Sequence, residues 1–202
     1  MIIKYNEENV NVDFIVDVEN LEIFYEEVKV YNEEWFNNYK DKAFGTCLEK
    51  SFNLYYLRNG IISEVGEICD IVKKSIRDGH KIEDQIEKIH LELGDVLWYT
   101  ALIKKWYEEN DFADWQKFDS EFYEYVSITN ELSTMSLDLS YCVNNYIGIG
   151  SEDETVLSHL LQLISNFAKL TGSTLEKVAQ KNIDKLYSRK ERNAIQGSGD
   201  FR

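Results

Sequence analysis

The sequence predicts an all-α protein, an antiparallel helical bundle with a short irregular or strand-like arm at the N-terminus. The 202-residue chain has no proline and only ten glycines, so few positions interrupt a helix. From about residue 20 onward, apolar residues recur at the three- and four-residue spacing of one helix face. Hydrophobic residues make up 44% of the chain, which is enough to form a core. We therefore expect a single domain over residues 1–202.

The elements can be placed in order along the chain. The first 17 residues alternate weakly between apolar and polar side chains, which predicts a strand pair or an arm. Asp78-Gly79 should close the second helix, and Ser173 or Thr174 should cap the last one. The expected helices cover residues 20–42, 51–77, 83–107, 115–146, 153–170 and 174–187.

Charge limits the classes of ligand. The chain has 22 basic and 37 acidic side chains and a formal net charge of −15. This charge disfavours polymeric nucleic acid and anionic membrane surfaces, whereas a small polyphosphate can bind where divalent cations reverse the local field. The sequence shows no leader, no long apolar run and no metal-type pair among its three cysteines. We expect a cytoplasmic protein without membrane contact.

Two of the expected helices each carry a pair of acidic residues three positions apart. The pair is Glu64 and Glu67 in the second helix along the chain, and Glu92 and Asp95 in the third. At about 100° per residue, each pair lies about 100° and 160° to the same side of its apolar stripe. The stripes consist of Ile61, Val65, Ile68, Cys69, Val72 and Ile76 in one helix, and of Ile86, Ile89, Leu93, Val96, Leu97 and Thr100 in the other.

The two acid pairs predict a site for a divalent cation. Carboxylates at this spacing repel each other, so two such pairs suggest a compensating positive charge. If the helices pack antiparallel, four oxygen donors converge, which suits Mg²⁺ and metal-assisted attack on a phosphoryl group. In a chain with 37 acidic residues, however, many such pairs are simply solvated. Gly66 and Gly94 favour the site, because a glycine inside a helix usually permits a close approach of another segment.

Two segments resemble a known family. GIISEVGEICDIVKKSIRDG followed by LELGDVLWYTALI is similar to the signature of MazG-like nucleoside triphosphate pyrophosphohydrolases, E-x-x-E and then E-x-x-D on successive helices. The tail NIDKLYSRKERNAIQGSGDFR resembles the C-terminal segment of MazG-like proteins, many of them phage-encoded. The resemblance covers about residues 51–106 and 160–202. It implies the all-α fold of a superfamily that also includes dimeric dUTPases.

The resemblance implies an activity and a cofactor. The activity is hydrolysis of (deoxy)nucleoside triphosphates to a nucleoside monophosphate and pyrophosphate, as housekeeping of the nucleotide pool. Glu64, Glu67, Glu92 and Asp95 would bind Mg²⁺, for which Mn²⁺ can substitute, and water bound to the metal would attack the triphosphate. Glu64 or Glu67 would also orient or deprotonate this water. The chain is further expected to form a homo-oligomer, most simply a dimer.

Six further residues are candidate substrate contacts. A lysine pair stands where the family places a lysine near phosphate, although each lysine fits a solvated helix face equally well. An asparagine and a lysine match the tail motif, and a tyrosine on the acid face could touch a base. An arginine begins a basic stretch that could fold over a polyphosphate or fray. These candidates are Lys73, Lys74, Tyr99, Asn182, Lys185 and Arg189.

About 50 residues separate the segments that resemble the family. The expected organisation is metal-binding helices over 20–107, an insertion over 108–158, and C-terminal helices with a glycine-rich tail over 159–202. We interpret residues 120–172 as a degenerate second copy of the acidic unit, with coincidence between amphipathic helices as the alternative. In this alignment Glu131, Thr134, Gln162 and Ser165 stand in place of Glu64, Glu67, Glu92 and Asp95.

Three other functions compete with a general pyrophosphohydrolase. A dUTP- or dCTP-selective pyrophosphatase of the same superfamily fits the same residues. A non-catalytic nucleotide-binding regulator could retain the fold, although two intact acid pairs argue against it. A ferritin-like di-iron bundle needs two Glu-x-x-His pairs, and only Glu87 and His90 form one, on the other side of the helix from Glu92.

Overall fold

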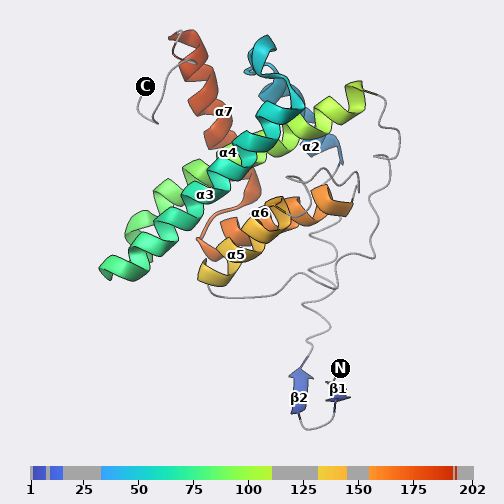
Figure 1. Ribbon diagram of the computed structural model, residues 1–202, viewed down its shortest axis with the longest axis vertical. Coiled ribbons are helices and arrows are strands. Elements are labelled where there is room, and N and C mark those ends of the chain that lie inside the picture. The colour runs from blue at the N-terminus through green and yellow to red at the C-terminus, as the bar shows by residue number, and fades with distance from the viewer. Residues whose placement is uncertain are drawn as a thin grey trace. The chain divides into compact units, whose positions relative to one another are not determined.

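The protein is described by a computed structural model over residues 2–7, 10–15, 33–110, 132–144, 155–192 and 194. It is an all-α helical bundle with two short strands near the N-terminus, as the sequence predicts (Figure 1). Contacts divide the chain into one unit over Met1–Asn37 and a second over Asn38–Arg202. The expectation of a single domain therefore stays a prediction. The expected helix over 20–42 falls partly outside the described residues, and the segment 111–131 lies wholly outside them.

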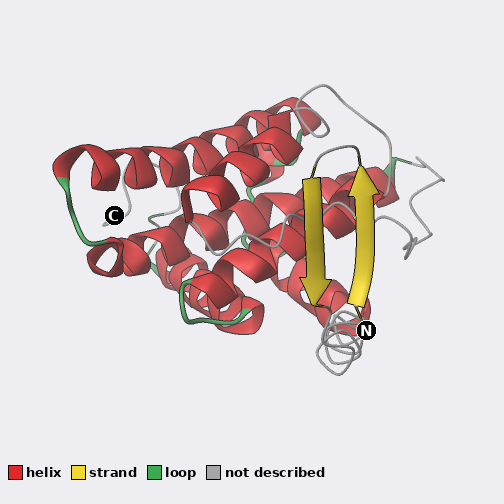
Figure 2. Ribbon diagram, turned by 90° about the horizontal axis from the view of Figure 1, so that it is seen from below, coloured by secondary structure: helices red, strands yellow, loops and turns green. Residues whose placement is uncertain are grey.

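The first unit contains the strand pair that the alternating pattern predicts. Strands β1 (Ile2–Glu7) and β2 (Val10–Ile15) are antiparallel (Figure 2), and Ile2 pairs with Ile15. Helix α2 (Glu33–Phe44) begins in this unit and ends in the second.

The acid pairs lie on a hairpin of two long helices. Helix α3 (Leu54–Asp78) begins at Asn53, whose side chain accepts hydrogen bonds from two backbone N–H groups, and ends at Gly79 with a left-handed φ of 65°. Helix α4 (Ile86–Glu109) follows after a short connection, so the two helices are antiparallel neighbours. Short 3₁₀ turns precede both helices, at Glu49–Ser51 and Ile82–Gln85.

The buried face of α3 departs from the expected apolar stripe at its last turn. Ile61, Val65 and Ile68 are buried, whereas Ile76 is 70% exposed and Ser75 is buried in its place. On a helical wheel Ile76 lies about 60° from Ile61 away from the acids, and Ser75 lies about 40° from it toward them. The packed face is thus turned toward the acid side, and the prediction of a buried Ile76 was wrong.

Three more helices lie in the described part of the second unit. Helix α5 (Leu132–Cys142) packs on α3 and on α6 (Thr155–Leu170), which also packs on α4 (Figure 1). Helix α7 (Leu175–Glu191) packs on α4 and α6, and begins at Thr174, whose hydroxyl accepts the N–H of Lys177. No helix in the described part of the chain is long and apolar enough to span a membrane.

The interpretation of residues 120–172 as a second copy stays a prediction. Helices α5 and α6 cover only part of this segment, and Glu131 lies outside the described residues. Gln162 and Ser165 are buried in α6, where the Gln162 amide donates to Asn166.

Candidate functional site

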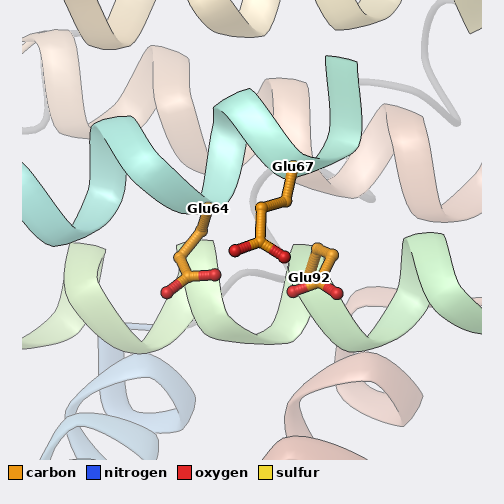
Figure 3. A group of neighbouring side chains, drawn as sticks. All are labelled: Glu64, Glu67 and Glu92. Carbon is orange, nitrogen blue, oxygen red and sulfur yellow. The ribbon is translucent and has the colours of Figure 1, made fainter. Parts of the chain in front are cut away.

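Three of the four acids come together between α3 and α4. Glu64 and Glu67 point from α3 toward α4, and Glu92 points from α4 toward them (Figure 3). Each offers a carboxylate oxygen, and these oxygens lie within 4.8 Å of one another. Glu92 is buried, Glu64 is half-buried and Glu67 is exposed, so the cluster opens to solvent on one side.

Asp95 stands apart from the three glutamates because α7 holds both of its oxygens. The Asn182 amide donates to Oδ1 at 2.7 Å, and the Lys185 ammonium donates to Oδ2 at 2.5 Å. Gly94 makes this approach possible, since a Cβ there would lie 2.9 Å from Asn182 Cβ. In turn, the buried Tyr39 hydroxyl donates to Asn182 Oδ1 at 3.3 Å. The structure thus links the two tail-motif residues to the fourth acid.

The four acids nevertheless form one electrostatic group. Burial, together with the negative charges of Asp95, Glu92 and Glu67, raises the pKa of Glu64 from 4.5 to about 8. Lys185 opposes this shift, but does not cancel it. A set of hard oxygen donors with net negative charge fits Mg²⁺ or Mn²⁺ better than a soft metal.

Metal-free protein should therefore lose stability as the pH rises. Because the pKa of Glu64 is about 8 in the folded protein, the protonated carboxyl contributes its full share to the free energy of unfolding below about pH 4.5. This share is lost as the pH rises toward 8. Glu64→Gln removes this titration. In urea unfolding with EDTA, the free energy of unfolding should fall between pH 5 and 8 by at least about 1.4 kcal/mol more in wild type than in Glu64→Gln. This difference corresponds to a pKa shift of about one unit. Parallel pH profiles for the two proteins would contradict this assignment.

A cleft of about 590 Å³ continues from the carboxylate cluster along α3 and α4. Glu67 and Glu92 line it, together with Lys74, His80 and Lys88. This volume falls within the range of small-molecule sites. Lys73 lines a separate depression of about 530 Å³ between α3 and α5. The structure therefore separates the lysine pair, and places only Lys74 beside the acids. Both lysines form ion pairs with Asp70.

Tyr99 lies at the other end of the cluster. Its ring packs so closely on Gly60 that a Cβ there would lie 2.2 Å from a ring carbon. The exposed Tyr56 ring lies 6.3 Å away, centre to centre. Burial raises the pKa of Tyr99, and so do Tyr56 and the charges of Glu64 and Asp95. Tyr99 thus faces the acids, as its place on the helical wheel predicts.

The remaining residues singled out from the sequence do not belong to the carboxylate cluster. Arg189 is buried in α7 rather than in a frayed tail. A Cβ on Gly66 would meet no atom within 4 Å among the described residues, so those residues make no close approach there, and the role of Gly66 stays a prediction. Glu87 forms an ion pair with Lys181, and His90 forms a hydrogen bond with Thr171. Neither residue therefore belongs to the carboxylate cluster. The Glu-x-x-His pair thus does not support the alternative of a di-iron site.

Sequence reasoning missed three residues around the site, namely Tyr39, Tyr56 and Gly60. No short-range pattern marks Tyr39, because its partner Asn182 is 143 residues away. Gly60 had a detectable signal, since a glycine one turn before the first acid interrupts a strong helix.

Comparisons with known proteins agree with this geometry. Residues 52–125 match the MazG nucleotide pyrophosphohydrolase domain, and this segment includes all four acids. The chain is also 26% identical to the Gene 37 protein of Mycobacterium phage L5 over 151 residues, which are 74% of this chain and 76% of that protein. No solved structure matches significantly. Residues 52–125 thus match a MazG nucleotide pyrophosphohydrolase domain, within a chain whose remaining residues lie outside that match.

Proposed function

We propose that the protein hydrolyses (deoxy)nucleoside triphosphates to a nucleoside monophosphate and pyrophosphate, with Mg²⁺ as its cofactor. The observation that supports this proposal is the convergence of Glu64, Glu67 and Glu92 within 4.8 Å, inside the matched domain. The net charge of −15 adds support, because a polyphosphate needs a bridging cation to approach such a surface.

The acidic residues would have different roles according to their solvent exposure. Glu64, Glu67 and Glu92 would hold Mg²⁺, or Mn²⁺ in its place, with Asp95 as a fourth donor. The ion would polarise a phosphoryl oxygen and lower the pKa of a water molecule. Glu67 is exposed and lines the cleft, which supports a role for it in orienting the attacking water.

The substrate would contact both ends of the carboxylate cluster. Lys74 in the cleft would bind phosphate as a point charge. Tyr99 would contact the nucleoside, with Asn182 and Lys185 near the phosphates or sugar. Lys73 and Arg189 have less support, because one lines a different depression and the other is buried.

A panel of all common ribo- and deoxyribonucleoside triphosphates, with product identification, tests the proposal. We expect equal amounts of monophosphate and pyrophosphate with Mg²⁺, and none with EDTA. Glu67→Gln should lower kcat/KM by about 100-fold or more, the upper range for losing a metal's supporting groups. Glu83→Gln, an exposed acid outside the cleft, is the control.

The outcome also separates the alternatives. Turnover confined to dUTP or dCTP would establish the selective enzyme. Nucleotide binding without turnover would refute the proposal in favour of a regulator, and equal activity of Glu67→Gln and wild type would refute the role of Glu67. Light scattering tests the expected homodimer.

A further inference from the structure

We propose that Lys185 is a built-in counter-cation that occupies Asp95 in the substrate-free protein and moves to the phosphates of a bound nucleotide. Asp95 would then bind a second divalent ion, shared with the substrate, and would do so only when substrate is present. This inference rests on the proposed function, and adds an order of events to it. It begins from a difference among the four acids, since three form a cluster and the fourth is paired with α7.

The first step concerns what a divalent ion meets in the absence of nucleotide. The three glutamates offer oxygens within 4.8 Å of one another, so they form a site without Asp95. Both oxygens of Asp95 accept hydrogen bonds from α7, and one donor is the charged Lys185 at 2.5 Å. A divalent ion on the same oxygen would face this ammonium at close range, and the two positive charges repel.

The second step concerns which of the two partners can leave. Asn182 is 2% exposed, and the buried Tyr39 hydroxyl holds its amide, so it cannot leave without disturbing α7. The side chains of Lys185 and Asp95 are 13% and 16% exposed. Lysine is a compact charge on a flexible stem with rotatable donors, so Lys185 can change partner while its backbone stays in place. Asn182 would then keep Asp95 oriented.

The third step concerns why nucleotide causes the exchange. A triphosphate carries more negative charge than one carboxylate, and lysine binds phosphate well as a point charge. Once Lys185 turns to phosphate, Oδ2 of Asp95 is available to a cation that also bridges the substrate. The nucleotide thus assembles the last part of its own metal site.

Binding of Mn²⁺, followed by electron paramagnetic resonance, tests this order. Wild type without nucleotide should bind Mn²⁺ at the three glutamates, and should gain an additional ion with a non-hydrolysable α,β-methylene triphosphate. Lys185→Met should bind that additional ion without nucleotide, with an affinity about tenfold or more above wild type. Lys185→Arg keeps the charge and should behave as wild type.

Two further variants serve as controls. Lys181→Met removes a lysine one turn earlier in α7, which pairs with Glu87, and should leave Mn²⁺ binding unchanged. Asp95→Asn should abolish the additional ion in the wild-type and Lys185→Met backgrounds alike, which separates it from Mn²⁺ carried by the nucleotide itself. Thermal unfolding checks that each variant is folded.

The outcomes distinguish this inference from the proposed function. If Lys185→Met and wild type bind Mn²⁺ identically without nucleotide while wild type hydrolyses triphosphates, the exchange is overturned and the enzyme assignment survives. If wild type already binds the additional ion without nucleotide, the exchange is also overturned. If wild type binds no Mn²⁺ and hydrolyses nothing, both fail.

Discussion

Replacing Glu92 by glutamine is expected to lower kcat/KM for triphosphate hydrolysis by about 100-fold or more. Glu92 is 6% exposed, and it is the only acid of the three-glutamate cluster that α4 contributes. Its loss leaves Asp95 as the acid of α4 at the site, and both oxygens of Asp95 already accept hydrogen bonds from α7. Steady-state kinetics over a range of Mg²⁺ concentrations measures the effect.

The stability of Glu92→Gln separates loss of the site from loss of the fold. The charge of Glu92 raises the pKa of Glu64, so neutralising it relieves repulsion in the metal-free protein. We expect an unchanged or higher melting temperature in EDTA, together with a smaller rise on addition of Mg²⁺. Glu87→Gln changes an exposed acid of the same helix, and should have wild-type activity. Wild-type kinetics for Glu92→Gln would remove Glu92 from the site.

Gly94→Ala is expected to damage stability and activity together. The added Cβ would lie 2.9 Å from Asn182 Cβ and 3.2 Å from its amide nitrogen, so α7 must shift away from α4. Overpacking of this kind lowers the free energy of unfolding by about 1–3 kcal/mol. The higher helix propensity of alanine raises it by about 1 kcal/mol, so we expect a net loss of stability. The shift also disturbs the bond from Asn182 to Asp95, so kcat/KM should fall about tenfold or more.

Gly66→Ala provides the matched comparison for stability. It makes the same chemical change in a neighbouring helix, where no described atom lies within 4 Å of the added Cβ. Helix propensity then acts alone, and unfolding should require about 1 kcal/mol more than in wild type. The difference between the two alanine variants in chemical denaturation isolates the clash. Equal stabilities would show that α4 and α7 do not pack tightly at Gly94.

The sequence predicts the all-α fold and the α3–α4 hairpin well, because both depend on local regularities. Apolar spacing, Gly79 and Thr174 mark helix faces and ends without information from distant residues. The convergence of Glu64 and Glu67 with Glu92 follows from the same wheel arithmetic and a short connection. The error at Ile76 arose because the packed face is turned toward the acids, which periodicity alone does not reveal.

The surroundings of Asp95 could not be predicted in the same way. Spacing places it beside Glu92, but its hydrogen-bond partners come from α7, 87 and 90 residues later in the chain. Tyr39 joins the same network from α2. Such contacts depend on how helices pack in three dimensions, and a single sequence has no periodic signal for them. The tail motif identified Asn182 and Lys185 as candidate residues, but it did not indicate that both contact Asp95.

The long separation between Asp95 and its partners has a consequence for synthesis on the ribosome. The three-glutamate cluster is complete in the chain once α4 has emerged, while Lys185 and Asn182 are still to be translated. A nascent chain at that stage carries the glutamates without the ammonium group that later neutralises Asp95. Divalent ions in the surrounding fluid would then add positive charge at the glutamates, and would favour early docking of α3 on α4 before the last helix is made.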